Sequence, residues 1–231
     1  MNPKSILGIT ALTAVSGLAL VPCLEAQTSK TEQAELTPDK VLSELMEGNA
    51  RYVEGNLTEI DIKAGIAATA GGQFPKAVIL SCLDSRVPVE MVFDQGIGDI
   101  FVGRVAGNIE NKDQLGSMEF ATKLAGSKLV MVLGHTSCGA VKGACDDAKL
   151  GNVTALLANI KPAVEAVGGH EGKRNSKNLD FVNEVVAENV KITVKDIREQ
   201  SEVLSEMEKA GEIKIVGGIY DLATGKVTLL D

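Results

Sequence analysis

Two cysteines and one histidine carry the clearest chemistry in the sequence, because their side chains are good ligands for a transition metal. Cys82 follows one apolar run, and His135 and Cys138 follow another, with two residues between them. Two thiolates and one imidazole suit zinc, and three protein ligands leave one tetrahedral position open. A structural zinc site would normally complete its shell with a fourth Cys or His. The pattern therefore predicts a catalytic site with one zinc ion per chain.

Asp84 and Arg86 lie shortly after Cys82, at the same expected strand end. A guanidinium that pairs with a carboxylate through two hydrogen bonds keeps it ionised and fixes its orientation. A plain surface ion pair is the alternative, and it would contribute little. Beside a zinc ion, an ionised Asp84 can accept a hydrogen bond from a bound hydroxide, or it can occupy the fourth position itself. These two options would be an active and a resting state.

Two other residues of reactive type are given no part in this site. Cys145 is expected to be a small buried hydrophobe. His170 lies in the glycine-rich stretch 168–172, which is expected to form a mobile, exposed loop.

The elements that must position the site follow from the hydrophobic pattern. Short apolar runs predict buried strands, and segments with helical spacing of apolar residues lie between and around them. The expected strands are 77–80, 100–102, 129–133, 213–216 and 227–230, and the expected helices are 38–52, 115–124, 140–150 and 179–200.

Buried strands that alternate with helices indicate an α/β fold whose core is a largely parallel β-sheet flanked by helices. Ligands of such sheets bind at the carboxyl ends of the strands. Cys82 and Asp84 follow the strand expected at 77–80, and His135 and Cys138 follow the strand expected at 129–133. Both reactive groups are therefore expected at strand ends.

Length and composition are those of an ordinary soluble globular protein. The chain has 231 residues, of which 45% are hydrophobic and 3% aromatic. Its 31 acidic and 23 basic side chains give a formal net charge of -8, so its surface repels phosphate backbones and anionic lipid headgroups. Nucleic acid and a membrane surface are therefore not expected as partners.

Residues 37–231 contain no repeat or linker and are expected to form one domain, preceded by a flexible segment at 27–36.

Residues 1–26 have the pattern of a secretory signal peptide. Lys4 supplies a basic start, and residues 6–21 form a nearly uncharged apolar run that is too short for a stable membrane span. Cleavage after Ala26 is expected, and lipidation at Cys23, which would anchor the chain to a membrane, is the alternative. Either route predicts a periplasmic or secreted protein. An odd number of cysteines would then remain in an oxidising compartment, where metal binding would keep thiols from pairing.

Cys82-x-Asp84-x-Arg86 together with His135-x-x-Cys138 resembles the signature of the β-class carbonic anhydrases. The resemblance extends over most of the chain after the signal peptide, through 73–108, 118–144 and 182–227. It implies the β-carbonic anhydrase fold, with an N-terminal helical arm and a parallel sheet. It also implies a zinc lyase that reversibly hydrates carbon dioxide to bicarbonate and a proton by attack of zinc-bound hydroxide. Cys82, His135 and Cys138 would be the zinc ligands, and Asp84 and Arg86 the catalytic dyad.

The resemblance also implies an assembly and a substrate pocket. In the family the active site lies at a dimer interface, so a homodimer or a dimer-based tetramer is expected. Gln73, Phe101 and Phe120 match positions that line the pocket there, and the Gly139 amide could steady the substrate oxygen. Ile79 stands where the pH-gated branch of the family has a Trp, which favours the constitutively open branch.

Two other functions remain open from the sequence. Relatives that hydrolyse carbon disulfide or carbonyl sulfide share the fold and the metal, and sequence alone does not exclude one. A non-catalytic zinc-stabilised or redox-active thiol protein is the second alternative. The chain has no Cys-x-x-Cys, which removes the usual redox arrangement, and the presence of Asp84 and Arg86 argues against a non-catalytic role.

Overall fold

A computed structural model describes residues 28–230 of the chain. The expected signal peptide, its cleavage point and the alternative lipidation site at Cys23 lie outside the described residues. Within the described part, no helix combines the length and the apolar character needed to cross a membrane.

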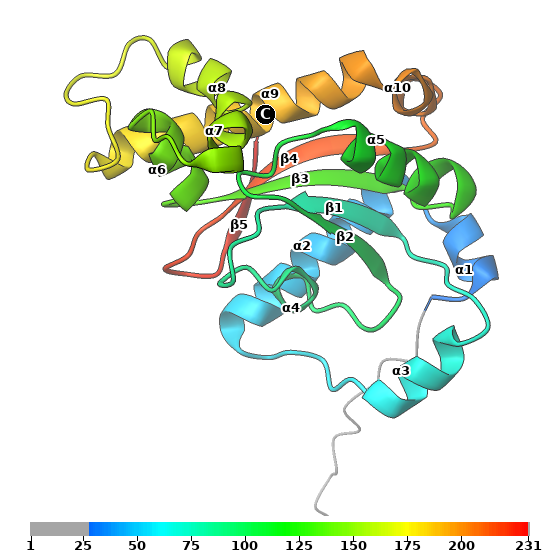
Figure 1. Ribbon diagram of the computed structural model, residues 1–231. Helices are drawn as coiled ribbons and strands as arrows, with labels where there is room; N and C mark the ends of the chain where they lie inside the picture. The colour runs from blue at the N-terminus through cyan, green and yellow to red at the C-terminus, as the bar shows by residue number, and fades with distance from the viewer. Residues whose placement is uncertain (1–27, 231) are drawn as a thin grey trace, which may run out of the picture.

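A five-stranded sheet forms the centre of the molecule, with strand order β2-β1-β3-β4-β5 (Figure 1). The strands are β1 (Ala77–Ser81), β2 (Ile100–Arg104), β3 (Leu129–His135), β4 (Lys214–Tyr220) and β5 (Val227–Leu230). The first four pair in parallel, and β5 pairs antiparallel with β4 at one edge. The prediction of a largely parallel sheet is therefore confirmed.

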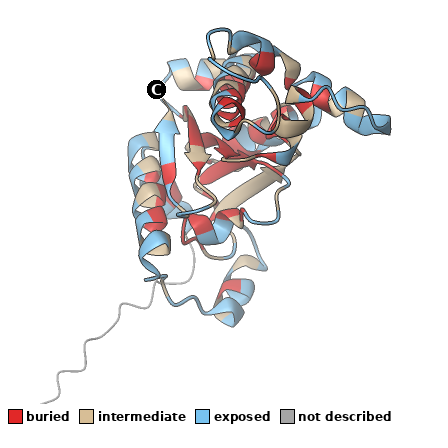
Figure 2. Ribbon diagram, turned by 90° about the vertical axis from the view of Figure 1, so that its left-hand side faces the viewer, coloured by how far each residue is buried: buried red, intermediate tan, exposed pale blue. Residues whose placement is uncertain are grey.

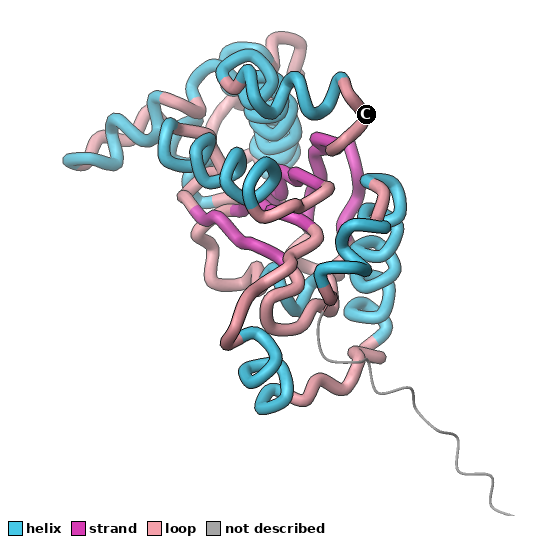
Figure 3. The backbone as a smooth tube through the Cα atoms, turned by 90° about the vertical axis from the view of Figure 1, so that its right-hand side faces the viewer, coloured by secondary structure: helices cyan, strands magenta, loops and turns pink. Residues whose placement is uncertain are grey.

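Helices cover both faces of this sheet (Figures 1 and 3). They are α1 (Lys30–Glu35), α2 (Pro38–Glu54), α3 (Ile62–Thr69), α4 (Val89–Val92), α5 (Lys112–Glu119), the π-helix η1 (Phe120–Leu124), α6 (Gly139–Cys145), α7 (Gly151–Ala158), α8 (Lys161–Ala166), α9 (Leu179–Gln200) and α10 (Glu202–Lys209). The helix expected at 179–200 is confirmed at both ends. The helix expected at 38–52 is present as α2, with Thr37 as its N-cap and Pro38 in its first turn.

The central strands are apolar on both sides because each side packs against a helical layer. In β1, Val78 and Leu80 pack with residues of α5, α9 and α10, whereas Ala77 and Ile79 pack with residues of α2 and α4. All five residues of β1 and all seven of β3 are buried, and the buried strands occupy the middle of the molecule in Figure 2. This explains why continuous apolar runs, rather than alternating patterns, mark these strands in the sequence.

Glycines in β3 and β4 allow α9 to lie close to the sheet. A Cβ atom on Gly134 would lie 2.6 Å from one methyl group of Val190. A Cβ atom on Gly217 would lie 2.7 Å from the other methyl group of Val190. A larger residue at either position would force Val190 or the whole of α9 to shift. The close approach matters because α9 supplies polar contacts to the loops that carry the candidate site.

Two local expectations were wrong. The helix expected at 140–150 ends at Cys145, since Asp147 adopts a left-handed conformation with φ 54° and turns the chain before α7. The segment expected to be flexible at 27–36 contains α1, which begins with a capping box at Ser29. The Gln33 side chain attaches α1 to the domain by donating hydrogen bonds to the carbonyls of Pro75 and Ala125.

Asp94 ties the chain after α2 to the domain. It follows α4 in a left-handed conformation, and its carboxylate accepts hydrogen bonds from the backbone N–H and the hydroxyl of Thr58 and from Arg51 Nε, the last at 2.6 Å. Burial alone would raise the pKa of Asp94, but the hydrogen bonds from Thr58 and Arg51 outweigh burial and lower it.

The lowered pKa of Asp94 predicts a pH-dependent contribution to stability. The contribution is fully present above the ordinary pKa of an aspartate, about 4, and is lost as the pH falls through the lower folded-state value. Asp94→Asn keeps the size of the side chain and tolerates the left-handed backbone. Denaturant unfolding of both proteins should show the variant less stable at neutral pH, with the difference shrinking below about pH 4. A difference that does not change with pH would contradict this assignment.

Candidate metal centre and active site

The three predicted metal ligands meet at the carboxyl ends of β1 and β3. Cys82 directly follows β1, His135 ends β3, and Cys138 immediately precedes α6. Their donor atoms all lie within 4.8 Å of one another, and the two sulfur atoms are 3.9 Å apart. All three residues are buried, with exposed fractions of 4%, 0% and 1%. The structure thus brings together residues that are separated by more than fifty positions in the sequence.

The imidazole of His135 is oriented for a metal. Its Nδ1 donates a hydrogen bond to the carbonyl of Thr136 at 3.0 Å, which leaves the lone pair on Nε2. Nε2 is buried and has no hydrogen-bond partner within the described structure. A buried nitrogen without a partner is costly unless something occupies the space in front of it. Together with two thiols, it fits a zinc ion, and no other group of three such ligands occurs within residues 28–230.

The two thiols of the cluster differ in acidity. The hydrogen bond from Cys138 is the main cause that lowers the pKa of Cys82 to about 4, against the opposing effect of burial, and contacts with His135 and Gly107 lower it further. The pKa of Cys138 is raised by its interaction with Cys82 and by burial. Cys145 lies outside the cluster, is only partly buried, and has a pKa raised by burial.

Asp84 and Arg86 form the expected pair beside the cluster. Arg86 donates from Nε to Asp84 Oδ1 at 2.9 Å and from Nη2 to Oδ2 at 2.7 Å, and its backbone N–H also binds Oδ1. These bonds hold the pKa of Asp84 well below its usual range. Oδ2 lies 3.7 Å from His135 Nε2, so the carboxylate faces the same point as the three metal ligands. This placement distinguishes the pair from an ordinary surface ion pair.

Residues that hold the two ligand-bearing loops were missed by the sequence analysis. Asn183 of α9 accepts a hydrogen bond from the backbone N–H of Ser137, which lies in a left-handed conformation between His135 and Cys138. Asn189, also on α9, donates to the carbonyl of Gly107, whose own N–H points at the sulfur of Cys82 at 3.3 Å. The only sequence signal for Asn189 is its place as a polar residue on the largely apolar face of a helix.

Gly107 needs to be glycine. Its φ is 79°, and a Cβ there would lie 2.5 Å from the side chain of Ile160. Any other residue would be strained at this φ and would displace the side chain of Ile160.

Arg104, the last residue of β2, is the third residue missed. Its Nε donates to the carbonyl of Cys82 at 3.1 Å and its Nη2 to the carbonyl of Asp84 at 2.6 Å. The sequence signal for Arg104 was its position as a charged residue at the carboxyl end of a half-buried strand. The metal ligands follow the carboxyl ends of the neighbouring strands.

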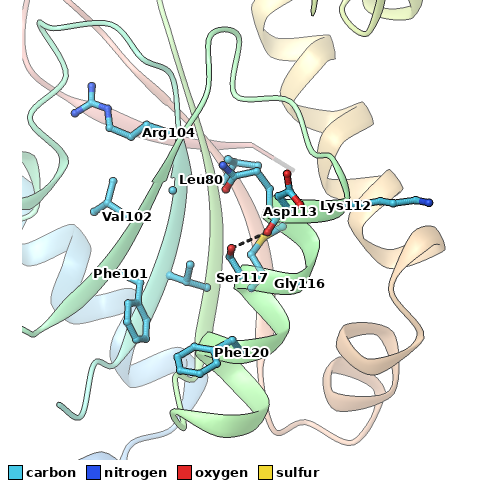
Figure 4. Close-up of a pocket in the computed structure, with 13 residues that line it drawn as sticks. Leu80, Phe101, Val102, Arg104, Lys112, Asp113, Gly116, Ser117 and Phe120 are labelled. Atoms are coloured by element: carbon cyan, nitrogen blue, oxygen red, sulfur yellow. Dashed lines mark hydrogen bonds between the residues drawn. The ribbon is translucent and has the colours of Figure 1, made fainter. Parts of the chain in front are cut away.

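Two of the predicted pocket residues come together on the β2 edge of the sheet. Phe101 of β2 and Phe120 of η1 meet edge to face, with ring centroids 6.4 Å apart. Figure 4 shows both rings among the side chains that line a groove between β2 and α5, with Arg104 at the opposite end. The volume of this groove is about 760 Å³. Phe120 is 51% exposed, so this apolar surface is open to solvent in the single chain.

The other two predicted pocket residues lie apart. Gly139 begins α6 next to Cys138, and nothing within 4 Å would obstruct a side chain there. Gln73 is exposed and precedes β1, so it lies toward the end of the sheet opposite the metal ligands. A single chain does not bring Gln73 to the site.

The expectation of an exposed His170 was wrong. Its side chain is only 9% exposed, with Nδ1 3.0 Å from Glu184 and Nε2 2.8 Å from the amide of Asn178. The ring also packs on Phe181. Glycines on both sides give the chain the freedom to fold His170 back onto α9.

Comparisons with known proteins identify a family and several relatives of this chain. The family model described as Carbonic anhydrase matches residues 77–227. Carbonic anhydrase 2 of Mycobacterium tuberculosis is 39% identical over 196 residues, which cover 81% of this chain and 90% of that protein. The β-carbonic anhydrase CafA of Aspergillus fumigatus has a similar structure, with a TM-score of 0.63 and 25% identity over 84% of this chain and 90% of its own. A chain of the tetrameric β-carbonic anhydrases of Sordaria macrospora shares the fold, with a TM-score of 0.63 and 21% identity over 83% and 95% of the two chains.

Proposed function

The chain belongs to the β-class carbonic anhydrases, and we propose that it hydrates carbon dioxide reversibly by means of a zinc ion held by Cys82, His135 and Cys138. One observation carries the proposal. The buried, partnerless His135 Nε2 and the two thiol sulfurs converge within 4.8 Å, and an ionised carboxylate oxygen of Asp84 lies 3.7 Å from that nitrogen.

When bound, zinc supplies a Lewis acid that makes a nucleophile from water near neutral pH. The protein residues provide the metal ligands, a hydrogen-bond acceptor and a hydrogen-bond donor at the site. Two thiolates and one imidazole form a three-ligand set with one position open, and burial keeps competing ligands away. Asp84, ionised because of Arg86, provides an acceptor that orients an O–H group at the open position. The backbone N–H of Gly139 is available to a substrate oxygen next to Cys138.

We also propose that the site rests in the open state. Both carboxylate oxygens of Asp84 already accept hydrogen bonds from Arg86, so Asp84 has no need of a metal to balance its charge. Ile79 is fully buried and apolar where the pH-gated branch of the family has a Trp.

A homodimer that covers the β2 edge of the sheet is the proposed assembly. The groove beside Phe101 and Phe120 is open and has both polar and apolar side chains in its lining. Its apolar part includes the exposed ring of Phe120, and Leu124 on the same π-helix is 75% exposed. Exposed apolar surface next to a free strand edge favours association with another chain. A second copy seated there would also have to supply Gln73, which its own chain keeps away from the metal ligands. The tetrameric relatives of Sordaria macrospora are consistent with dimers that associate further.

Export from the cytoplasm is proposed from the sequence alone. The basic Lys4 and the short apolar run at 6–21 are typical of a signal peptide. A periplasmic or secreted carbonic anhydrase would interconvert carbon dioxide and bicarbonate outside the cytoplasm.

The role of Asp84 can be tested by comparing Asp84→Asn with the wild type. Because the amide cannot accept and orient the same O–H group, kcat for carbon dioxide hydration should fall by about 10²-fold or more, while zinc content stays at about one ion per chain. Stopped-flow hydration and metal analysis of the same preparations give both values. Asp147→Asn, which changes an exposed carboxylate on the far side of α6, is the control and should keep wild-type activity. Unchanged hydration by Asp84→Asn, or a wild type that binds zinc without hydrating carbon dioxide, would contradict the proposed function.

The proposed dimer can be tested with two matched surface variants. Leu124 and Leu150 are almost equally exposed, at 75% and 71%, but only Leu124 borders the proposed interface. Leu124→Asp should shift the protein toward monomers in sedimentation or light scattering, since an unpaired buried charge is costly. Leu150→Asp should leave the assembly unchanged. If both variants had the same oligomeric state, this interface would be ruled out.

The export proposal predicts a processed N-terminus. Expression of the full chain in a bacterium, followed by fractionation and intact-mass measurement, should give a periplasmic or secreted protein cleaved after Ala26. A diacylglycerol-modified Cys23 would support the lipoprotein alternative instead. A full-length protein retained in the cytoplasm would refute export.

A further inference from the structure

Arg104 makes an unusual pair of contacts for a residue of an edge strand. Its guanidinium binds two backbone carbonyls, those of Cys82 and Asp84, at 3.1 Å and 2.6 Å. The register of the sheet explains the reach, because Arg104 is paired with Ser81, the residue just before Cys82. The planar fork of an arginine can hold two acceptors at a fixed separation, which a lysine ammonium cannot do.

The backbone that Arg104 holds is packed at Cys82, which is buried in the core, but not at the next residue. Leu83, which lies between the two carbonyls, is 65% exposed and so contributes little packing. The bonds between Arg86 and Asp84 lie within the same loop, so they orient the carboxylate relative to the loop but do not fix the loop on the sheet. Arg104 supplies that connection from a neighbouring strand.

We propose that Arg104 is a positioning residue that fixes the metal ligand Cys82 and the dyad carboxylate Asp84 relative to each other. It acts through the main chain, because its hydrogen bonds end on carbonyl oxygens and not on the reacting groups. Loss of these bonds frees the turn that begins at Asp84, whose carbonyl also accepts from Val87 N–H. Both the sulfur of Cys82 and the carboxylate of Asp84 then lose their fixed separation. The inference rests on the proposed function, in which Cys82 binds zinc and Asp84 orients the nucleophile.

Arg198 offers a matched control for the general effect of losing a partly buried arginine. It also makes a two-pronged contact, with Glu208, and donates to the carbonyl of Ile215 at 2.8 Å. Ile215 lies near the start of β4, and β4 runs parallel to β3, so this contact is at the end of the sheet opposite the metal ligands. Arg104→Ala and Arg198→Ala therefore each remove a two-pronged guanidinium contact, at opposite ends of the sheet.

The test compares zinc release to a chelator, kcat and KM in Arg104→Ala, Arg104→Lys, Arg198→Ala and the wild type. Arg104→Ala should release zinc about 10- to 100-fold faster and lose kcat with KM changed by less than about 2-fold, because the chemistry and not substrate capture is affected. Guanidinium ion in solution should restore part of the kcat of Arg104→Ala but not alter Arg198→Ala. Arg104→Lys keeps the charge but replaces the two-pronged contact by one nitrogen. Its zinc-release rate and kcat should therefore lie between those of the wild type and of Arg104→Ala. If Arg104→Ala does not fold, the comparison of Arg104→Lys with the wild type tests the proposal.

Sedimentation of each variant separates this effect from loss of assembly, since Arg104 also borders the groove beside Phe101. Zinc release and kcat equal to those of Arg198→Ala, or wild-type values in Arg104→Lys, would overturn the inference while leaving the proposed function intact. A wild type that lacks zinc or hydration activity would overturn the proposed function, and the inference with it.

Discussion

The parallel pairing of β1 with β3 is the constraint on which the site depends. Ser81 is paired with Leu133, so the first residue beyond β1 and the last residues of β3 necessarily lie side by side. This pairing brings Cys82 next to His135 and to the turn that carries Cys138, and the helical layers on both faces keep the two strands buried and in register. A shift of one residue in this pairing would turn the side chains to the opposite face and separate the ligands.

Burial gives these groups their chemical character. Buried thiols and an imidazole nitrogen without a partner are costly in a metal-free chain, and a bound cation would offset that cost. The same neighbourhood keeps Asp84 ionised, because Arg86 occupies both of its oxygens. Ligands, carboxylate and backbone donors therefore act as one electrostatic unit around a single position. The loops that carry them are held from outside by Asn183, Asn189 and Arg104.

Most of the sheet and of the candidate site was predictable from the sequence. The features that were not predicted were missed for physical reasons. Buried strands and the long helix at 179–200 have strong periodic patterns, and the ends of two such strands located the metal ligands and the dyad. Short helices such as α4 and α8 have too few residues for a pattern to develop. The early end of α6 depends on a left-handed Asp147, and the burial of His170 depends on Asn178 and Glu184, which only the folded chain brings near. Arg104 escaped notice because its partners are backbone carbonyls, which the sequence does not reveal.

The central claim is that two cysteines and one histidine bind a zinc ion and leave a position open. X-ray absorption at the zinc edge of the zinc-loaded protein tests it most directly. The account predicts two sulfur neighbours at about 2.3 Å together with nitrogen or oxygen neighbours at about 2.0–2.1 Å. A shell of four sulfur atoms, or one without sulfur, would contradict the account.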